Sequence, residues 1–233
     1  MSSLNLLRKV ICLAILLAFF YSSADARRPE RIRVRMETTA GKFTLELFNE
    51  TPIHRDNFVH LVREGFYDGI LFHRVIKNFM VQAGDPESKL APAGKELGEG
   101  DVGYTLPAEI RTPEIFHRRG MLAAAREGDE VNPERRSSGA QFYVVWGKRH
   151  EEAELRELRT RCDPYMEKPV ELTSDMLRAY RIDGGTPHLD GLYTVFGRVV
   201  KGLKVIGRIQ RTRTDEHDRP VEDVRILRAY VIE

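Results

Sequence analysis

Cysteine is almost absent from this chain of 233 residues, which contains only Cys12 and Cys162. Cys12 lies in an N-terminal segment that we expect to be removed, so the mature protein would keep a single thiol. One cysteine cannot form a disulfide within its own chain, and zinc sites built on four cysteines are excluded. A chain of this length can be stable through its hydrophobic core alone. We interpret Cys162 as a spare thiol in a variable loop, with reactivity or pairing between chains as alternatives.

A surplus of charge of either sign is also lacking. Lys and Arg number 37 against 35 Asp and Glu, and acidic residues interleave with the arginine-rich stretches. This balance gives no indication of nucleic-acid binding. The sequence lacks an HExxH motif, a Gly-x-Ser-x-Gly elbow, a phosphate loop and a dinucleotide glycine fingerprint. No pair among its seven histidines has the spacing of metal ligands, so we expect neither a metal nor a cofactor.

Only one long apolar run is present, and it lies near the N-terminus. Arg8 and Lys9 precede the apolar residues 10–20, and Ala24-Asp25-Ala26 follows. This is the pattern of a secretory signal peptide, and the run is short for a membrane span of roughly 20 residues. We predict cleavage after Ala26, with a retained anchor as the alternative. The mature protein, residues 27–233, would be periplasmic or secreted without stable membrane insertion. The lack of a eukaryote-type retention signal favours a bacterial periplasm.

Short β-strands dominate the pattern of the remaining chain. Ile32, Val34 and Met36 alternate with charged residues, which is the period of a half-buried strand. From this and similar patterns we expect strands at 32–36, 43–47, 70–76, 79–83, 104–106, 120–125, 140–146, 192–200 and 221–232. Helices are expected at about 52–64, with Thr51 as the N-cap, and at 150–161, 173–181 and 203–209. Many short strands and few helices indicate a closed β-barrel or a sandwich.

One stretch, residues 71–85, places a guanidinium among apolar side chains. Two short strands around a tight turn would bring Arg74 and Gln82 close to a pair of large apolar residues. A buried arginine without a partner is unfavourable, and no acidic residue lies near Arg74 before Asp85. We therefore expect Arg74 to be either paired or functional.

These side chains suit a reaction that requires no nucleophile. Rotation about an Xaa-Pro peptide bond has a barrier of about 18–20 kcal/mol, which arises from amide resonance. Lowering it requires a pocket for the proline ring, a group that holds the neighbouring carbonyl, and a donor directed at the prolyl nitrogen. That nitrogen gains a lone pair as the bond twists, and a permanently charged arginine could stabilise it electrostatically.

Four segments, in chain order, resemble the cyclophilin family of peptidyl-prolyl isomerases. They read FHRVIKNFMVQAGD (72–85), GMLAAAR (120–126), AQFYVV (140–145) and LDGLYTVFGRV (189–199). The resemblance extends over about 31–233, except for a helical insertion at 148–186. It implies a mainly β fold: a closed antiparallel barrel of about eight strands, capped by helices. It also implies an isomerase that acts on Xaa-Pro bonds. Together with the predicted export, we expect its substrates to be proline-containing unfolded or nascent exported polypeptides, whose folding the protein assists as a monomer.

The resemblance also assigns roles to individual residues. Arg74 corresponds to the catalytic arginine, Gln82 to a glutamine that binds the substrate backbone, and Phe79 to the floor of the proline pocket. These three are the expected catalytic residues. The expected substrate-binding residues are Met80, Ala125, Arg126, Gln141, Tyr143, His188, Leu189 and Tyr193. Taken alone, Phe79, Met80 and Leu189 would be interpreted as ordinary core residues.

Five features depart from the family pattern. Tyr143 replaces a phenylalanine and adds a hydroxyl to a pocket wall. Arg126 replaces an asparagine that acts through its main chain, and Tyr193 replaces a histidine. His188 replaces a tryptophan associated with cyclosporin binding, so we expect weak sensitivity to that drug. The insertion should emerge near the cleft, where it either contacts longer substrates or a partner, or forms a solvated helical hairpin of little consequence.

Two other functions remain open at this stage. One is a binding module or chaperone with the same fold and little turnover, although Arg74 argues against it because a pure binder could lose this residue. The other is a β-barrel that binds a carbohydrate or another small ligand.

Overall fold

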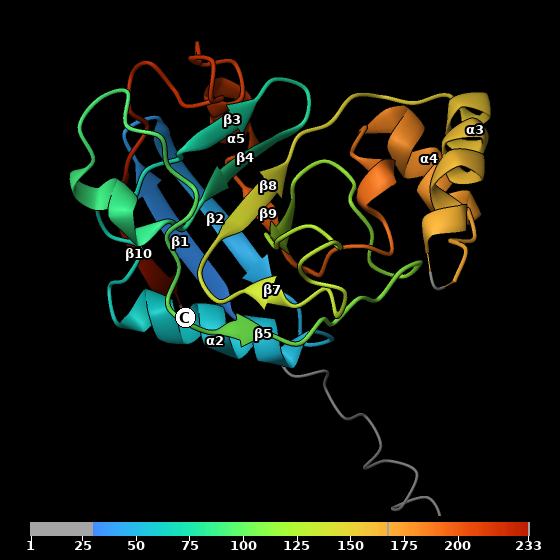
Figure 1. Cartoon of the computed structure of the whole chain (residues 1–233), viewed down its shortest axis with the longest axis horizontal. Helices are drawn as coiled ribbons and strands as arrows, with labels where there is room; N and C mark the ends of the chain where they lie inside the picture. Colours follow the sequence, from blue (N-terminus) through green and yellow to red (C-terminus); the bar gives the residue numbers. More distant parts are fainter. Residues whose placement is uncertain (1–29, 167, 233) are drawn as a thin grey trace, which may run out of the picture. The chain divides into compact units, whose positions relative to one another are not determined.

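The computed structural model describes residues 30–166 and 168–232, in which β-strands form the main layer (Figure 1). The strands of the main sheet are β1 (Arg33–Thr38), β2 (Gly41–Leu47), β3 (Arg74–Ile76), β4 (Met80–Ala83), β6 (Met121–Ala124), β8 (Phe142–Val145), β9 (Val195–Lys201) and β10 (Ile226–Ile232). Their order is β10-β1-β2-β9-β6-β8-β4-β3, and every pair is antiparallel. Strands β5 (Thr105–Leu106) and β7 (Ser137–Ser138) form a small second sheet. The predicted signal peptide, residues 1–26, lies outside the described residues.

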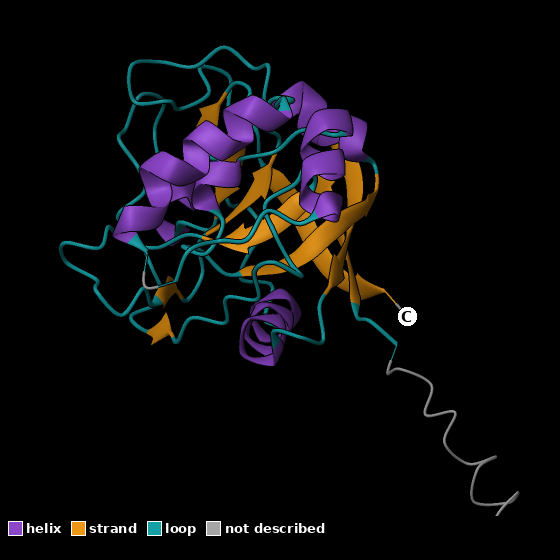
Figure 2. Cartoon of the chain, turned by 90° about the vertical axis from the view of Figure 1, so that its right-hand side faces the viewer, coloured by secondary structure: helices purple, strands orange, loops and turns teal. Residues whose placement is uncertain are grey.

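The main sheet is curled into a half-barrel (Figure 2), which confirms the prediction of a mainly β fold with about eight antiparallel strands. Strands β10 and β3 end the strand order, and no ladder joins them in the described part of the chain. The segment that precedes β3 is instead joined by backbone hydrogen bonds to the start of β10 and the residues just before it. Phe72 N donates to Val224 O and Ile226 N donates to Ile70 O, each at 2.8 Å. A closed ring of eight paired strands is therefore not confirmed.

Helix α2 (Pro52–Arg63) begins where predicted, with Thr51 at the N-cap position, but another side chain accepts the hydrogen bonds of its first N–H groups. A proline occupies its first turn, whereas the buried Thr51 side chain makes no hydrogen bond to the helix. The carboxylate of Glu109 accepts hydrogen bonds from the backbone N–H groups of Ile53 and His54 at 3.2 and 2.9 Å. A carboxylate at this position satisfies two free donors and interacts favourably with the helix dipole. Thr51 therefore occupies the N-cap position, as predicted, but its side chain does not cap the helix, because a residue distant in the sequence supplies the acceptor.

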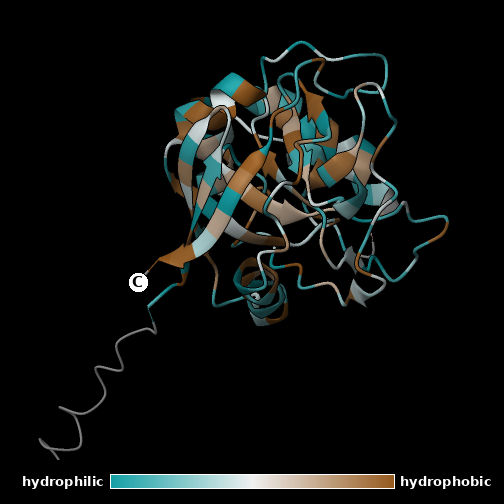
Figure 3. Ribbon diagram, turned by 90° about the vertical axis from the view of Figure 1, so that its left-hand side faces the viewer, coloured by the Kyte–Doolittle hydropathy of each residue, from teal (hydrophilic) through white to brown (hydrophobic). Residues whose placement is uncertain are grey.

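The main core lies between the inner face of the sheet and its covering helices. Val34, Met36, Phe43 and Leu45 alternate into it from β1 and β2, as the sequence pattern predicts. Helix α2, seen nearly end-on in Figure 3, carries both hydrophobic and hydrophilic residues and buries its apolar side chains in the same core. Helix α5 (Leu203–Ile209) also packs against this core.

The 148–186 segment forms two helices that lie together beside the sheet (Figures 1 and 2). These are α3 (Glu152–Cys162) and α4 (Ser174–Ile182). Leu155, Met176 and Tyr180 are almost fully buried in an apolar cluster of their own, which also includes Phe116 from outside the segment. The segment is therefore a packed unit rather than a bare solvated hairpin.

Local signals predict most of the remaining elements. The Thr173 cap of α4 is confirmed, since its hydroxyl accepts a hydrogen bond from Met176 N at 3.3 Å. Cys162 is the last residue of α3 rather than a loop residue, and β10 begins at Ile226, later than predicted. The described residues also form the short 3-10 helices η1 (Pro86–Leu90), η2 (Asp163–Tyr165) and η3 (Pro187–Leu189). None of the helices in residues 30–166 and 168–232 is long and apolar enough to cross a membrane.

Candidate active site

The β3–β4 hairpin divides its residues between two faces of the sheet. Arg74 pairs with Gln82 in the antiparallel register. Alternation along both strands turns Val75 and Val81 into the main core, so Arg74 and Gln82 lie together on the opposite face. The turn between the strands contains Asn78 at a φ of 60°, a conformation that asparagine tolerates better than most residues. The predicted hairpin is confirmed, and its register brings the two polar site residues together.

A second apolar cluster covers this opposite face, and we call it the outer cluster. Its buried members are Phe48, Met80, Met121, Ala123, Tyr143, Val145 and Val195, with Ile76, Phe79, Ile115, Ala125, Leu189 and Tyr193 packed against them. Six of the predicted site residues therefore meet here: Phe79, Met80, Ala125, Tyr143, Leu189 and Tyr193. The exposed His188 stacks on Phe79 with ring centroids 5.4 Å apart, which places it at the same cleft.

Two glutamines form the polar side of the site. Gln82 donates from Nε2 to Oε1 of Gln141 at 2.9 Å. Gln141 in turn donates to the carbonyl oxygens of Gly98 and Gly100 at 2.7 and 2.8 Å, which holds it in place. The Gln82 carboxamide oxygen has no hydrogen-bond partner in the described part of the chain and remains available to a ligand. Both glutamines and Ala125 line a cavity of about 690 Å³.

Arg74 has an acidic neighbour that sequence reasoning missed. Its Nε lies 3.6 Å from Oδ2 of Asp218, and the two side chains are 45% and 42% exposed. The Asp218 carbonyl accepts a hydrogen bond from Val75 N at 2.8 Å, which fixes the loop beside β3. Arg74, which we expected to be either paired or functional, is therefore paired, with an acidic residue that is not its neighbour in the sequence. No local pattern could reveal the pair, because the two residues are far apart in the sequence.

His73 is buried directly beside Arg74. Burial lowers the pKa of this histidine to about 4, Asp85 opposes the shift, and Arg74 and Arg219 add to it. The Asp85 carboxylate accepts a hydrogen bond from Gly98 N at 2.6 Å. The ring is therefore neutral near pH 7, and it lies behind the site under a loop that Asp85 pins.

Tyr143 uses its hydroxyl away from the cleft. The hydroxyl lies 3.0 Å from Nε2 of His117, and Nδ1 of the same ring lies 3.0 Å from Asp190. Because the carboxylate can only accept, Nδ1 donates to Asp190, and Nε2 shares a hydrogen bond with the tyrosine hydroxyl. Tyr180 of α4 donates to the other Asp190 oxygen at 2.6 Å. The predicted pocket wall is thus anchored through a buried chain of polar groups to the 148–186 segment, and His117 is a residue that sequence reasoning missed.

Arg126 acts as a packing residue at the cleft edge. Its guanidinium lies 4.4 Å from the ring centroid of Tyr193, within the range of a cation–π interaction. It also donates from Nε to the Leu192 carbonyl at 2.9 Å and pairs with Asp129 at 2.6 Å. The side chain is therefore occupied within the protein, which leaves the main chain as the part that a ligand could use.

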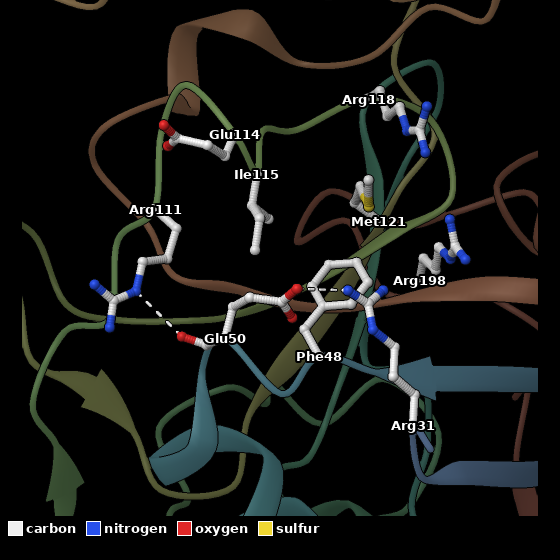
Figure 4. A pocket seen from close by; sticks show the side chains of 9 residues that line it. All are labelled: Arg31, Phe48, Glu50, Arg111, Glu114, Ile115, Arg118, Met121 and Arg198. Carbon is white, nitrogen blue, oxygen red and sulfur yellow. Dashed lines mark hydrogen bonds and ion pairs between the residues drawn. The ribbon is translucent and has the colours of Figure 1, made fainter. Parts of the chain in front are cut away.

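A separate cavity of about 650 Å³ shares Phe48, Ile115 and Met121 with the outer cluster but contains none of the predicted site residues (Figure 4). Four arginines and two glutamates surround these apolar residues. Arg31 pairs with Glu50 at 2.7 Å and Arg198 with Glu46 at 2.7 Å, so much of the charge is balanced internally. Within the described residues, no group of three His, Cys, Asp or Glu side chains could hold a metal ion.

Almost the whole described part of the chain is similar in sequence to known proteins. The profile described as "Cyclophilin type peptidyl-prolyl cis-trans isomerase/CLD" matches residues 33–231. The chain is 36% identical over 194 residues to a putative peptidyl-prolyl cis-trans isomerase of Staphylococcus haemolyticus, covering 83% of this chain and 87% of the relative. It is 33% identical to peptidyl-prolyl cis-trans isomerase-like 1 of Aspergillus oryzae, covering 86% and 95%.

A solved structure shows the same fold. It is the crystal structure of a cyclophilin type peptidyl-prolyl cis-trans isomerase from Cryptosporidium parvum. The two structures have a TM-score of 0.61 at 23% sequence identity, and the match covers 87% of this chain and 98% of that one. At this level of identity the likeness establishes the arrangement of the strands and helices alone.

Proposed function

Because the chain belongs to the family of cyclophilin-type peptidyl-prolyl cis-trans isomerases, we propose that it accelerates rotation about Xaa-Pro bonds through Arg74. One observation carries this proposal. Arg74 is half-exposed on the face of the sheet that bears the outer cluster, with the available carboxamide oxygen of Gln82 opposite it. A charged donor therefore borders an apolar surface that suits a proline ring.

In the proposed mechanism, the proline ring rests on Phe79, Met80 and Leu189. As the bond twists, the prolyl nitrogen loses amide conjugation and becomes a hydrogen-bond acceptor. The Arg74 guanidinium donates to this nitrogen and is thus bound more strongly in the twisted state than in either planar state, which is the requirement for catalysis. Gln82 binds the neighbouring substrate backbone and restricts the rotation to one side of the bond.

The remaining predicted residues complete the cleft. Gln141 orients Gln82 through their 2.9 Å hydrogen bond, and Tyr143 forms the wall behind the ring. Ala125 and the main chain of Arg126 bind the substrate backbone on one side. His188 and Tyr193 form the opposite edges of the cleft, where their rings contact the residues that flank the proline.

The natural substrates in this proposal are unfolded or nascent exported polypeptides, whose folding the protein assists as a monomer. The signal-peptide pattern of residues 1–26 supports a periplasmic or secreted location. Sequencing the N-terminus of the protein isolated from its own cells tests this location. A mature chain that begins at Arg27 is expected, and a chain that still begins at Met1 would contradict export by cleavage.

A protease-coupled isomerisation assay on wild type, Arg74→Ala and Arg156→Ala tests the catalytic proposal. We expect kcat/KM to fall about 100-fold or more in Arg74→Ala, which is the usual effect of removing a charged donor to the transition state. Arg156, an exposed arginine on α3 with a 2.6 Å pair to Glu152, is the matched control and should leave the rate unchanged. A wild type that does not exceed the uncatalysed rate would refute the proposal.

A binding module with little turnover is the second candidate, because the Asp218 pair engages part of the Arg74 guanidinium. It predicts that the wild type binds proline peptides without accelerating their isomerisation. The same assay, combined with a peptide-binding measurement, separates the two functions.

A further inference from the structure

Helix α3 forms one wall of a further pocket, different from the two cavities described above, which begins at the edge of the proposed proline cleft. The pocket has a volume of about 430 Å³. Phe79 and His188 line it from the side of the cleft, and Leu158 and Glu157 line it from α3. Phe79 and His188, whose rings stack with their centroids 5.4 Å apart, therefore line this pocket and also belong to the proposed proline cleft.

The wall formed by α3 is held firmly against the cleft edge. Arg159, which is 5% exposed, donates from Nη2 to the carbonyl oxygen of Pro187 at 2.7 Å, and Pro187 directly precedes His188. On the other side of the segment, the Tyr180 hydroxyl donates to the buried Asp190 at 2.6 Å. These two buried contacts clamp the residues on either side of His188, so the pocket is already formed before any ligand arrives.

The lining of the pocket combines apolar side chains with charged side chains that are paired with one another. Leu158 is half-buried, yet in the described part of the chain it belongs to none of the three apolar clusters. Among the charged lining residues, Lys148 lies 3.5 Å from Glu154 and Arg161 lies 3.9 Å from Glu157. A charged ligand side chain would therefore find no unpaired opposite charge among these four residues. His188 offers the face of a neutral ring, because its partly desolvated position lowers its pKa to about 4.

We propose that this pocket binds one large apolar side chain, preferentially aromatic, of a residue close to the proline in the same polypeptide substrate. Such a side chain would contact Leu158 and stack on the His188 ring, an arrangement that aromatic pairs favour. An extended chain advances about 3.3–3.6 Å per residue, so a residue two or three positions from the proline reaches past the Phe79–His188 pair. The inference rests on the proposed isomerase function and assigns a role in substrate selection to the 148–186 segment.

Isomerisation of paired peptides tests the pocket. The peptides differ only in Phe or Ala at one position, up to about three residues before or after the proline. For wild type, we expect kcat/KM at one of these positions to be about fivefold to tenfold higher for Phe than for Ala, mainly through KM. In Leu158→Ser this ratio should fall to about one. Leu90→Ser, at a leucine that is 95% exposed on η1, is the matched control and should keep the ratio.

A pocket-filling variant, Leu158→Trp, keeps the test informative if the serine variant is unstable, and it should also abolish the preference. The inference is overturned if wild type shows no preference for Phe over Ala at any position. It is also overturned if both Leu158 variants keep the wild-type preference. If wild type isomerises no peptide, the proposed function has failed instead. In that case, fluorescence anisotropy measures the binding of labelled versions of the same peptides. Tighter binding of the Phe peptide than of the Ala peptide, lost in the Leu158 variants, supports the pocket. Equal binding of the two peptides to wild type refutes it.

Discussion

Asp218 orients the Arg74 side chain without burying it. The pair is separated by 3.6 Å and both side chains are more than two-fifths exposed, so water and salt screen their attraction. Exposed ion pairs of this kind contribute about 0.2–1 kcal/mol, which is small enough for Arg74 to turn towards a twisted prolyl nitrogen. At the scale of single residues, we therefore predict that Asp218 positions Arg74 for the proposed catalysis.

Substitution of Asp218 should lower activity while leaving stability almost unchanged. The residue has a φ of 62°, so Asp218→Gly and Asp218→Asn both keep the backbone conformation. We expect kcat/KM to fall about fivefold in the glycine variant and less in the asparagine variant, which retains an acceptor. The isomerisation assay measures both values, and a urea titration checks stability. Equal kcat/KM in all three proteins would show that Asp218 has no positioning role.

The Tyr143 hydroxyl contributes to stability through His117. Tyr143→Phe leaves Nε2 of the buried His117 without its partner at 3.0 Å, so the free energy of unfolding should fall by about 1–3 kcal/mol. The matched control is Tyr193→Phe, because the Tyr193 hydroxyl makes no hydrogen bond within the described residues, and its effect should stay within about 0.5 kcal/mol. Chemical denaturation measures both changes. A similar loss in the two variants would contradict the assigned role of His117.

Most helices and strands could be predicted from the sequence because their signals are local. Alternating apolar residues predict β1 and β2, and a Thr-Ser-Asp sequence predicts the start of α4. The contacts that could not be predicted join residues far apart in the chain. Glu109 accepts hydrogen bonds from the N-terminus of α2, and Asp218 forms an ion pair with Arg74. The sequence around each of these two acidic residues contains no pattern that indicates the distant residue it contacts. The predicted site residues converge because the family resemblance supplied this long-range information, which spacing alone does not contain.

At the scale of elements, the N-terminus of α2 depends on Glu109. Glu109→Ala removes the acceptor of two backbone N–H groups and of the His54 ring, which lies 2.7 Å away. We expect the free energy of unfolding to fall by about 2–3 kcal/mol. By contrast, Thr51→Val replaces a buried hydroxyl without a hydrogen-bond partner in the described chain, so it should be neutral or slightly stabilising. Urea denaturation of both variants measures the difference, and a larger loss in Thr51→Val would restore Thr51 as the cap.

At the scale of the whole molecule, buried histidines make stability depend on pH. His54, His73 and His150 are all buried, and burial lowers the pKa of each below the ordinary value of 6.5. The unfolded chain therefore binds protons that the folded protein excludes, and stability must fall as the pH falls through this range. His73 has the lowest pKa of the three, because Arg74 and Arg219 add their repulsion to the effect of burial.

The contribution of His73 can be isolated from the slope of stability against pH. Its pKa is about 4 in the folded protein and 6.5 in the unfolded chain, so the free energy of unfolding should fall by about 3 kcal/mol between these two values as the pH is lowered. In the His73→Gln variant, the side chain at position 73 cannot titrate. The free energy of unfolding of this variant should therefore fall less steeply over the same pH range, whatever its value at neutral pH. The exposed His60 on α2 provides a second histidine-to-glutamine variant, made at the surface, for comparison. Urea titrations from about pH 4 to about pH 7 measure the slopes, and parallel curves for wild type and His73→Gln would exclude His73 as the source.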